Sequence, residues 1–332
     1  MPPVLAHLVQ FGVAALGGFA FHRLGIPAAW LSGSMIAAVL WRASGQGRPL
    51  PKPLLDFAML ISGTAMGAGV TSESLAAVAR YPLSLASLAL GLVAISGASM
   101  LWLTRASGWR RDDAVLASVP GALSTVLIVA AERKADVGSI AIVQMFRLLV
   151  LMAVLPSIVV LAGGAQGEAW LGARQAIATP LGLAANLVGG LAAGALFRRI
   201  GIAAPILFGT AAVSAALHVT DLTPGVVPPA IATVSLVLIG MFIAENFRHL
   251  KWSAVRRLVP AALGSFVLGM AVASFFAAVG AKLARVGFAD ALVAFAPGGL
   301  EAMMVLALVL GLDPLYVGVH HLVRLIVLGF SI

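Results

Sequence analysis

Apolar residues are gathered into twelve long windows along the chain, separated by short polar segments. Most windows come close to the roughly 20 residues that an α-helix needs to cross about 30 Å of hydrocarbon. The longest polar segments, residues 42–52 and 247–257, are only as long as loops. This pattern predicts an all-α polytopic membrane protein. The twelve windows are residues 4–21, 26–41, 54–70, 83–103, 114–131, 140–162, 177–197, 202–219, 226–244, 258–281, 289–312 and 315–332.

Two stretches of the chain, residues 120–147 and 297–324, match each other without a gap. They read PGALSTVLIVAAERKADVGSIAIVQMFR and PGGLEAMMVLALVLGLDPLYVGVHHLVR, so that a Pro-Gly step, a leucine, an aspartate and an arginine recur 177 residues apart. Further pairs at offsets of 176 or 177, such as Gly33 with Gly209, extend the match over nearly the whole chain. This duplication predicts one membrane domain made of two repeats, residues 1–165 and 175–332.

The distribution of Lys and Arg indicates how the repeats are oriented, because cytoplasmic loops are enriched in both residues. Arg147 and Arg324 lie inside apolar windows and are left out of the counts. If all twelve windows cross the membrane, the two sides carry 10 and 9 basic residues. If the window with the Pro-Gly step returns to the side it entered from, the sides carry 14 and 5. The second arrangement leaves an odd number of crossings per half. It therefore predicts two inverted repeats, each of about five transmembrane helices plus one re-entrant hairpin, with both chain termini cytoplasmic.

Composition narrows the class of protein. A mean hydropathy of +1.07 with 10% charged residues leaves no soluble domain of useful size. The net charge of +9 is scattered over short loops, so we expect a lipid bilayer as partner and no nucleic acid. The absence of cysteine excludes disulfides and thiolate metal ligands. The N-terminus has no basic segment before its apolar run, which predicts a first span and not a cleaved signal. We expect an integral protein of a bacterial-type cytoplasmic (inner) membrane.

Each repeat places a Pro-Gly step and an arginine, Arg147 or Arg324, inside apolar sequence. A charged side chain at bilayer depth costs roughly 2.5 to 3.5 kcal/mol on insertion scales and normally faces a partner or a wet cavity. Backbone N–H groups at the start of a half-helix favour an anion, and the arginines add two full positive charges. The pattern predicts a substrate-binding site. Its candidate residues are Pro120, Gly121, Ser124, Gln144, Arg147, Pro297, Gly298, Gly299, Glu301, His321 and Arg324.

Other interpretations of these residues stay open. Each Pro-Gly step would also suit a loop turn, and each arginine would be able to snorkel to an interface. Gln144 lies three residues before Arg147, and His320 and His321 lie four and three residues before Arg324. These polar groups share a helix face with the arginines, and bonding to neighbouring helices would explain them as well as substrate contact.

Glu301 marks a difference between the repeats, because Ser124 stands at the matching position of the first. It falls in the first turn after the second Pro-Gly step, where an ionisable group is suited to couple transport to a proton or Na⁺. The alternative is a carboxylate that stabilises the helix N-terminus or pairs with Arg324. Asp136 and Asp313 are expected to cap the helices that follow them.

The paired blocks PGALS…D…Q..R and PGGLE…D…H..R resemble the AbrB-type membrane protein family, whose members carry an internal duplication. The similarity spans essentially the whole chain. Members of that family are labelled ammonia monooxygenases or AbrB-like regulators, so the resemblance implies those labels here. A copper site normally uses several imidazoles at ligand spacing, whereas the six histidines here are spread along the chain with one adjacent pair. We therefore expect no enzyme and no cofactor.

The sequence favours a secondary active transporter of a small, anionic metabolite that works by alternating access, with H⁺ or Na⁺ as the coupling ion. The runner-up is a membrane-bound oxidase, as the monooxygenase label implies. Further alternatives are a passive channel, a sensory membrane module, or a membrane protein that affects gene expression indirectly through a transported signal. A soluble nucleic-acid-binding domain, which a direct regulator would need, is not predicted. Whether the chain forms a homo-oligomer stays open.

Overall fold

The computed structural model describes residues 3–120, 123–163, 176–247 and 252–329 of the 332-residue chain. Over these residues the fold is built from helices, and a single bridge joins Ile177 to Val226. The elements are α1 (Pro3–Arg23), α2 (Ala29–Ala43), α3 (Lys52–Ala68), α4 (Ser72–Ala77), η1 (Val78–Arg80), α5 (Tyr81–Leu101), η2 (Trp102–Ala106), α6 (Arg111–Ser118), α7 (Leu123–Glu132), α8 (Val137–Leu161), α9 (Pro180–Arg199), α10 (Pro205–Val219), α11 (Pro229–Ile243), η4 (Ala244–Phe247), α12 (Trp252–Ala284), α13 (Phe288–Phe295), α14 (Leu300–Val309) and α15 (Pro314–Gly329).

Six helical runs within the described residues are long and apolar enough to cross a membrane. Shorter apolar helices, including α10, α14 and α15, accompany them. The all-α, membrane-type character predicted from the sequence is thereby confirmed. The six runs are Val4–Arg23, Ser72–Ala106, Val137–Leu161, Pro180–Arg199, Pro229–Phe247 and Ala254–Ala284.

The order of the helices repeats along the chain. Helices α6, α7 and α8 begin at residues 111, 123 and 137, and α13, α14 and α15 begin at residues 288, 300 and 314, each 177 residues later. Helices α1, α2 and α3 recur as α9, α10 and α11 at offsets of 176 or 177. The duplication therefore extends from residue identities to the boundaries of the helices.

Both Pro-Gly steps interrupt a helix. The first divides its apolar window into α6 of 8 residues and α7 of 10, and the second separates α13 and α14, which have the same lengths. Proline disfavours the helical region for the residue before it. Accordingly, Val119 has ψ 123° and Ala296 has ψ 137°, and the last helical residue of each first half-helix lies two residues before the proline.

The chain divides into two compact units, and each takes segments from both halves of the sequence. The first unit comprises Met1–Ala76, Pro156–Arg248 and Met304–Leu315. The second comprises Ala77–Leu155, His249–Met303 and Tyr316–Ile332.

Close helix crossings at glycine hold the first unit together. Helix α1 packs on α2, and α9 packs in the same way on α10. A methyl group at Gly33 would overlap the backbone of Gly17, and one at Gly209 would overlap the backbone of Gly194. Because a glycine has no side chain, the two backbones approach closely at each crossing. Each half of the chain therefore contains one such helix crossing between two glycines.

A second pair of glycines joins the halves reciprocally within this unit. Gly63 of α3 faces the carbonyl of Leu207 in α10, and the matching Gly240 of α11 faces the carbonyl of Leu31 in α2. A buried hydroxyl contact of 3.0 Å between Ser62 and Ser235 links α3 to α11. The contact from the first half to the second is therefore matched by an equivalent contact from the second half to the first.

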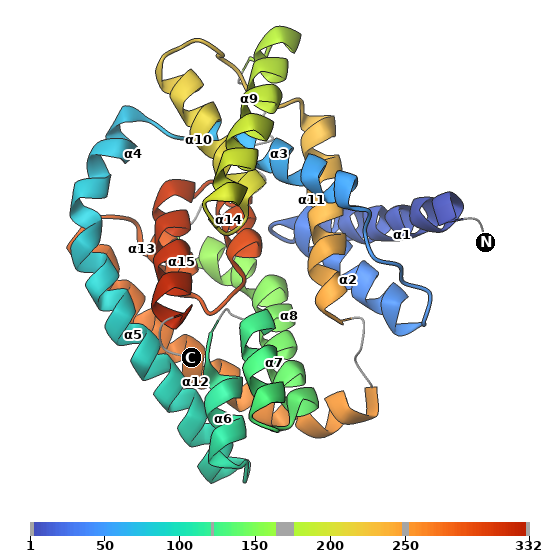
Figure 1. Ribbon diagram of the computed structural model, residues 1–332, viewed down its shortest axis with the longest axis vertical. Helices are drawn as coiled ribbons and strands as arrows, with labels where there is room; N and C mark the ends of the chain where they lie inside the picture. The colour runs from blue at the N-terminus through green and yellow to red at the C-terminus, as the bar shows by residue number, and fades with distance from the viewer. Residues whose placement is uncertain (1–2, 121–122, 164–175, 248–251, 330–332) are drawn as a thin grey trace. The chain divides into compact units, whose positions relative to one another are not determined.

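Helices α5 and α12 run side by side in the second unit, in teal and orange in Figure 1. The indole of Trp102 fills the space over Gly264 and donates a 3.2 Å hydrogen bond to the carbonyl of Ala261. An apolar cluster of α6, α7 and α8 packs against this pair, with Leu116, Val126 and their neighbours in its centre. This packing fixes the end of α6, next to which Arg147 lies.

Candidate functional site

Arg324 is the most fully enclosed charge among the described residues. Its side chain lies on α15 in the second unit and is 1% exposed. It donates hydrogen bonds to the carbonyl oxygens of Ala296 (2.6 Å) and Gly298 (2.5 Å), and a third to Nδ1 of His321. These carbonyls belong to the break between α13 and α14, so the guanidinium is hydrogen-bonded to the backbone of the second Pro-Gly step and of the residue before it. Its Nε is buried and has no hydrogen-bond partner among the residues that the structure describes.

Arg147 repeats this arrangement at the first Pro-Gly step. It lies on α8, is 7% exposed, and donates a 3.2 Å hydrogen bond to the carbonyl of Val119. Val119 and Ala296 occupy matching positions of the two repeats. Since both arginines are buried by protein, the alternative that they snorkel to an interface is not what the structure shows.

Gln144 and His321 form a second matching pair one helical turn away. Gln144 donates a 3.0 Å hydrogen bond to the carbonyl of Leu116, and Nε2 of His321 lies 3.0 Å from the carbonyl of Val293. Both contacts span 28 residues, as do those from Arg147 to Val119 and from Arg324 to Ala296. Gln144 and His321, two of the polar groups predicted to accompany the arginines, therefore bind the backbone of the first half-helix of their repeats.

Both arginines belong to the second unit, and the charge of Arg147 acts unfavourably on that of Arg324. Among the described residues, neither forms an ion pair with a carboxylate. Buried charges are normally paired or hydrogen-bonded, because removing them from water is costly. The hydrogen bonds to carbonyl oxygens offset part of this cost and leave two net positive charges in one region of the second unit.

The other predicted site residues lie around these breaks. Pro120, Pro297 and Gly298 are buried, and Gly299 is partly buried. Gly121 lies outside the described residues, and Ser124 belongs to α7 while its side chain also lies outside them.

Glu301, the predicted coupling group, is partly buried in the first turn of α14. In the part of the chain that the structure describes, no hydrogen bond or ion pair joins its carboxylate to another residue. Pairing with Arg324 is therefore not observed.

Both predicted helix caps are confirmed. Asp136 accepts hydrogen bonds from the backbone N–H (3.0 Å) and the hydroxyl (2.6 Å) of Ser139 at the start of α8. These bonds, with a smaller contribution from the charge of Arg257, hold the pKa of Asp136 below its usual value. Asp313 accepts a 2.9 Å hydrogen bond from the backbone of Leu315.

The beginning of α6 and the end of the segment after α7 are in contact with each other. The backbone N–H of Asp136, which follows α7, donates a 3.0 Å hydrogen bond to the carboxylate of Asp113, in the first turn of α6. Helices α6 and α7 therefore lead away from this point and return to it.

A buried polar cluster joins α5 to α15, and sequence reasoning missed most of it. The hydroxyls of Ser84 and Tyr316 are 2.5 Å apart, and Ser84 Oγ lies 2.9 Å from Nε2 of His320. Nδ1 of His320 lies 2.8 Å from the carbonyl of Tyr316. The ring of Tyr81 meets that of His320 at 5.9 Å between centroids. His320 was recognised only as a neighbour of Arg324, because nothing in one sequence pairs it with a serine 236 residues away.

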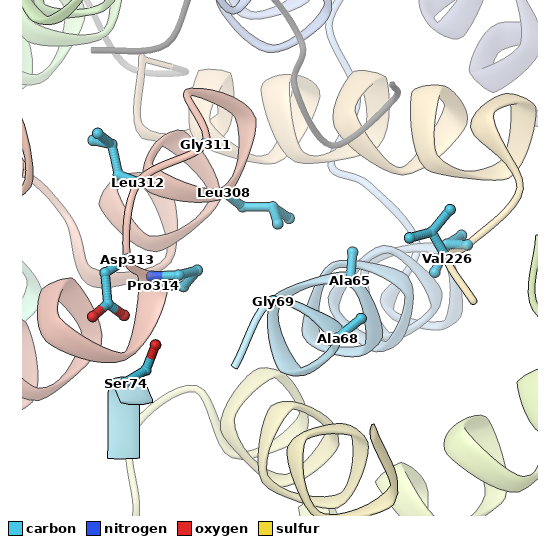
Figure 2. A pocket seen from close by; sticks show the side chains of 11 residues that line it. Ala65, Ala68, Gly69, Ser74, Val226, Leu308, Gly311, Leu312, Asp313 and Pro314 are labelled. Carbon is cyan, nitrogen blue, oxygen red and sulfur yellow. The ribbon is translucent and has the colours of Figure 1, made fainter. Parts of the chain in front are cut away.

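A pocket of about 370 Å³ lies in the first unit. The end of α3 lines one side through Ala65 and Ala68, and Ser74 and Asp313 lie at another (Figure 2). Of its lining residues, Ser74 and Asp313 have polar side chains, and none has a basic side chain. The pocket is therefore a separate feature from the buried arginines.

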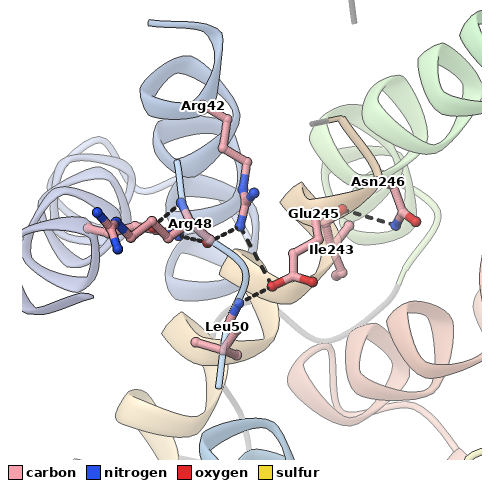
Figure 3. A network of polar contacts seen from close by, with 7 residues as sticks. Arg42, Arg48, Leu50, Ile243, Glu245 and Asn246 are labelled. Carbon is pink, nitrogen blue, oxygen red and sulfur yellow. Dashed lines mark hydrogen bonds and ion pairs between the residues drawn. The ribbon is translucent and has the colours of Figure 1, made fainter. Parts of the chain in front are cut away.

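A second polar network in the first unit fastens the loop after α2 (Figure 3). Arg42 donates a 2.6 Å hydrogen bond to the carbonyl of Arg48 and lies 3.6 Å from the carboxylate of Glu245, which also accepts from the backbone of Leu50. Gln10 of α1 bonds the backbone of Arg48 at 2.9 and 3.1 Å. Apart from the ion pair between Arg42 and Glu245, these contacts are made to backbone groups of the loop, so they hold the loop in place.

Histidine and acidic side chains in the described residues form no group of three or more that would hold a metal ion.

Long apolar helices, two interrupted helices and a buried arginine at each break define a membrane-type helical protein. The family described as "Transition state regulatory protein AbrB" matches residues 30–332, and the chain belongs to that family. The resemblance seen in the sequence is thereby confirmed. The chain is 25% identical to "Putative regulator AbrB" of Escherichia coli (strain K12), over 92% of this chain and 88% of that protein. It is also 25% identical to "Uncharacterized protein YhjN" of Bacillus subtilis (strain 168), over 97% of this chain and 90% of that protein.

Proposed function

We propose that the protein is a secondary active transporter of a small, anionic metabolite and works by alternating access between two inverted repeats. The observation that carries the proposal is the pair of buried arginines. The charge of Arg147 acts unfavourably on that of Arg324, and neither arginine forms an ion pair with a carboxylate among the described residues. Ionisable groups inside membrane segments mark substrate or ion pathways by default. An anion between the guanidinium groups would supply the missing negative charge.

Re-entrant geometry is supported by the contact between Asp113 and the backbone of Asp136. Helices of 8 and 10 residues are about 12 and 15 Å long at 1.5 Å per residue, roughly half the hydrocarbon thickness. A segment that leaves and returns to one point with such half-helices fits a hairpin whose tip lies near the bilayer centre. Half-helices ending near the midplane are typical of transporter binding sites.

An inverted relation of the repeats is supported by the reciprocal glycine contacts. Gly63 approaches the second repeat at the position where Gly240 approaches the first. Reciprocal contacts of this kind are expected from a two-fold axis between similar bodies. Combined with five crossings per half, such an axis would lie in the membrane plane.

The name of the Escherichia coli relative favours a second candidate, an effect on gene expression. We propose that any such effect is indirect and follows from the concentration of the transported metabolite. The proposal involves no enzyme chemistry and no resident cofactor.

Transport is tested with purified protein in proteoliposomes. Uptake of radiolabelled pyruvate, succinate, citrate and gluconate is measured with an H⁺ gradient, with a Na⁺ gradient, and with neither. We expect gradient-dependent accumulation of at least one anion, reduced at least tenfold in Arg324→Gln and unchanged in Arg199→Gln, at the exposed end of α9. The absence of gradient-dependent flux for every anion would contradict the proposal. Copper bound after purification from metal-replete medium would favour the monooxygenase label instead.

A further inference from the structure

The proton positions in the cluster around His320 follow from its partners. A neutral imidazole has one N–H and one lone pair, and a backbone carbonyl only accepts. Nδ1 of His320, 2.8 Å from the carbonyl of Tyr316, therefore carries the hydrogen. Nε2 accepts from the hydroxyl of Ser84 at 2.9 Å, and Ser84 Oγ accepts in turn from the hydroxyl of Tyr316 at 2.5 Å.

His321 is held in the opposite form. Its Nε2 lies 3.0 Å from the carbonyl of Val293 and so carries the hydrogen, while Nδ1 faces an N–H of Arg324, which is only a donor. A second proton on His321 would place two donors face to face beside a positive charge. The lone pair of His320 instead faces a hydroxyl, whose donor and acceptor roles can be exchanged by rotation.

We infer that His320 is the proton-binding group through which the transporter is coupled to H⁺. The inference rests on the proposed function and assigns its coupling ion. The proton adds to Nε2, Ser84 Oγ then accepts from Nε2–H, and the Ser84 hydroxyl turns to donate to the oxygen of Tyr316. One N–H bond forms, and no bond between heavy atoms changes.

Binding of the proton and binding of the anion are linked by the arginines. A positive charge on His320 would lie on the same helix as Arg324, which already interacts unfavourably with Arg147. An anion bound by these guanidinium groups would offset the repulsion between the positive charges. The bound anion then raises the affinity for the proton, and the bound proton raises the affinity for the anion. The geometry therefore points to symport of the anion with a proton. The titratable or charged groups that face His320 or follow it on α15 are Tyr81, Tyr316, His321 and Arg324.

The first repeat offers no equivalent proton-binding group. Val143 stands at the position that matches His320, and Ser139 at the position that matches Tyr316. The repeats therefore share the arginines but differ in this cluster.

The test uses the four radiolabelled anions in proteoliposomes and compares two modes of transport. Accumulation driven by an inward H⁺ gradient requires proton binding, whereas exchange of labelled for unlabelled anion at equal pH does not require net proton movement. We expect His320→Gln, which keeps a polar group and cannot bind the proton, to lose accumulation at least tenfold and to retain exchange within about threefold. The control His22→Gln changes an exposed histidine and should retain both modes. Ser84→Ala is a second variant, for which we expect a shifted pH profile of accumulation.

Each outcome bears on a distinct statement. The assignment of His320 is overturned if the wild type accumulates the anion equally with and without the H⁺ gradient. It is also overturned if His320→Gln leaves gradient-driven accumulation intact. Either result leaves the proposal of transport unaffected. If the wild type moves none of the four anions in either mode, the proposed function fails, and the inference fails with it. Loss of both modes in His320→Gln together with an unchanged pH profile in Ser84→Ala also overturns the inference.

Discussion

At the scale of single residues, the two arginines occupy matching positions with unequal bonding. Arg324 has three hydrogen bonds to described residues, and Arg147 has one. The planar guanidinium reaches several acceptors at once, which a lysine ammonium on its flexible stem does not reproduce. The repeats therefore provide an internal comparison between a strongly and a weakly bonded arginine.

We expect Arg324→Lys to lower the free energy of unfolding more than Arg147→Lys does. Hydrogen bonds to charged groups contribute about 1.5 to 3 kcal/mol each, so losing two of them should cost about 3 kcal/mol or more. The Arg147 variant should lose less than half as much. Reversible unfolding in a denaturing detergent, followed by circular dichroism, measures both. Equal losses would show that the additional bonds of Arg324 contribute nothing to stability.

The cap at Asp136 allows a prediction about pH. Asp136→Ala should cost about 1 kcal/mol at pH 7, the usual loss for a helix cap. Because the pKa of Asp136 is lowered in the folded protein, its carboxylate stabilises the fold above the unfolded pKa of about 3.9, and this contribution is lost as the pH falls through the folded value. The difference between wild type and variant should thus be constant from pH 5 to 8 and shrink below about pH 4. Asp136→Asn, which keeps the cap without the charge, should remove that pH dependence; a difference that grows in acid would refute this account.

At the scale of helices, apolar length and helix breakers together predicted more than either alone. The fourth window, residues 83–103, nearly coincides with α5, whereas the window at 114–131 conceals the break between α6 and α7 that Pro120 imposes. Helix α12 begins six residues before its window, because hydropathy excludes the charged turn at Arg256 and Arg257 although its backbone is helical. The caps were predictable because their donors are local in sequence. The cluster of Ser84, Tyr316 and His320 was not, since its members meet only through the packing of α5 on α15.

Helix α1 supplies a matched pair of glycines for testing the close crossings. Gly17→Ala would drive a methyl group into Ala37 and the carbonyl of Gly33, so we expect a loss of about 1 to 3 kcal/mol in the free energy of unfolding. Gly12 lies in the same helix with nothing within 4 Å of an added Cβ. Gly12→Ala should be neutral or stabilise by up to about 1 kcal/mol through higher helix propensity. The same unfolding assay applies, and a Gly12 variant as unstable as the Gly17 variant would mean that the crossing does not determine the loss.

At the scale of the whole molecule, transport by alternating access depends on which side of the membrane each loop faces. Lys134 follows α7, Arg111 begins α6, and Lys282 lies near the end of α12; all three are exposed. A re-entrant hairpin places Arg111 and Lys134 on one side, whereas a membrane-crossing segment would separate them. Inverted repeats place Lys282 opposite to both.

Because the chain has no cysteine, single substitutions Arg111→Cys, Lys134→Cys and Lys282→Cys can be labelled without background. In intact cells, an impermeant maleimide should label the Lys282 variant only, and in inverted membrane vesicles it should label the other two. The reagent's access to all three after detergent solubilisation serves as the control. Labelling of Arg111→Cys and Lys134→Cys from opposite sides would mean that the Pro-Gly segment crosses the membrane. Labelling of Lys134→Cys and Lys282→Cys from one side would rule out the inverted arrangement, and with it a site approached from both sides by half-helices that are related by a two-fold axis.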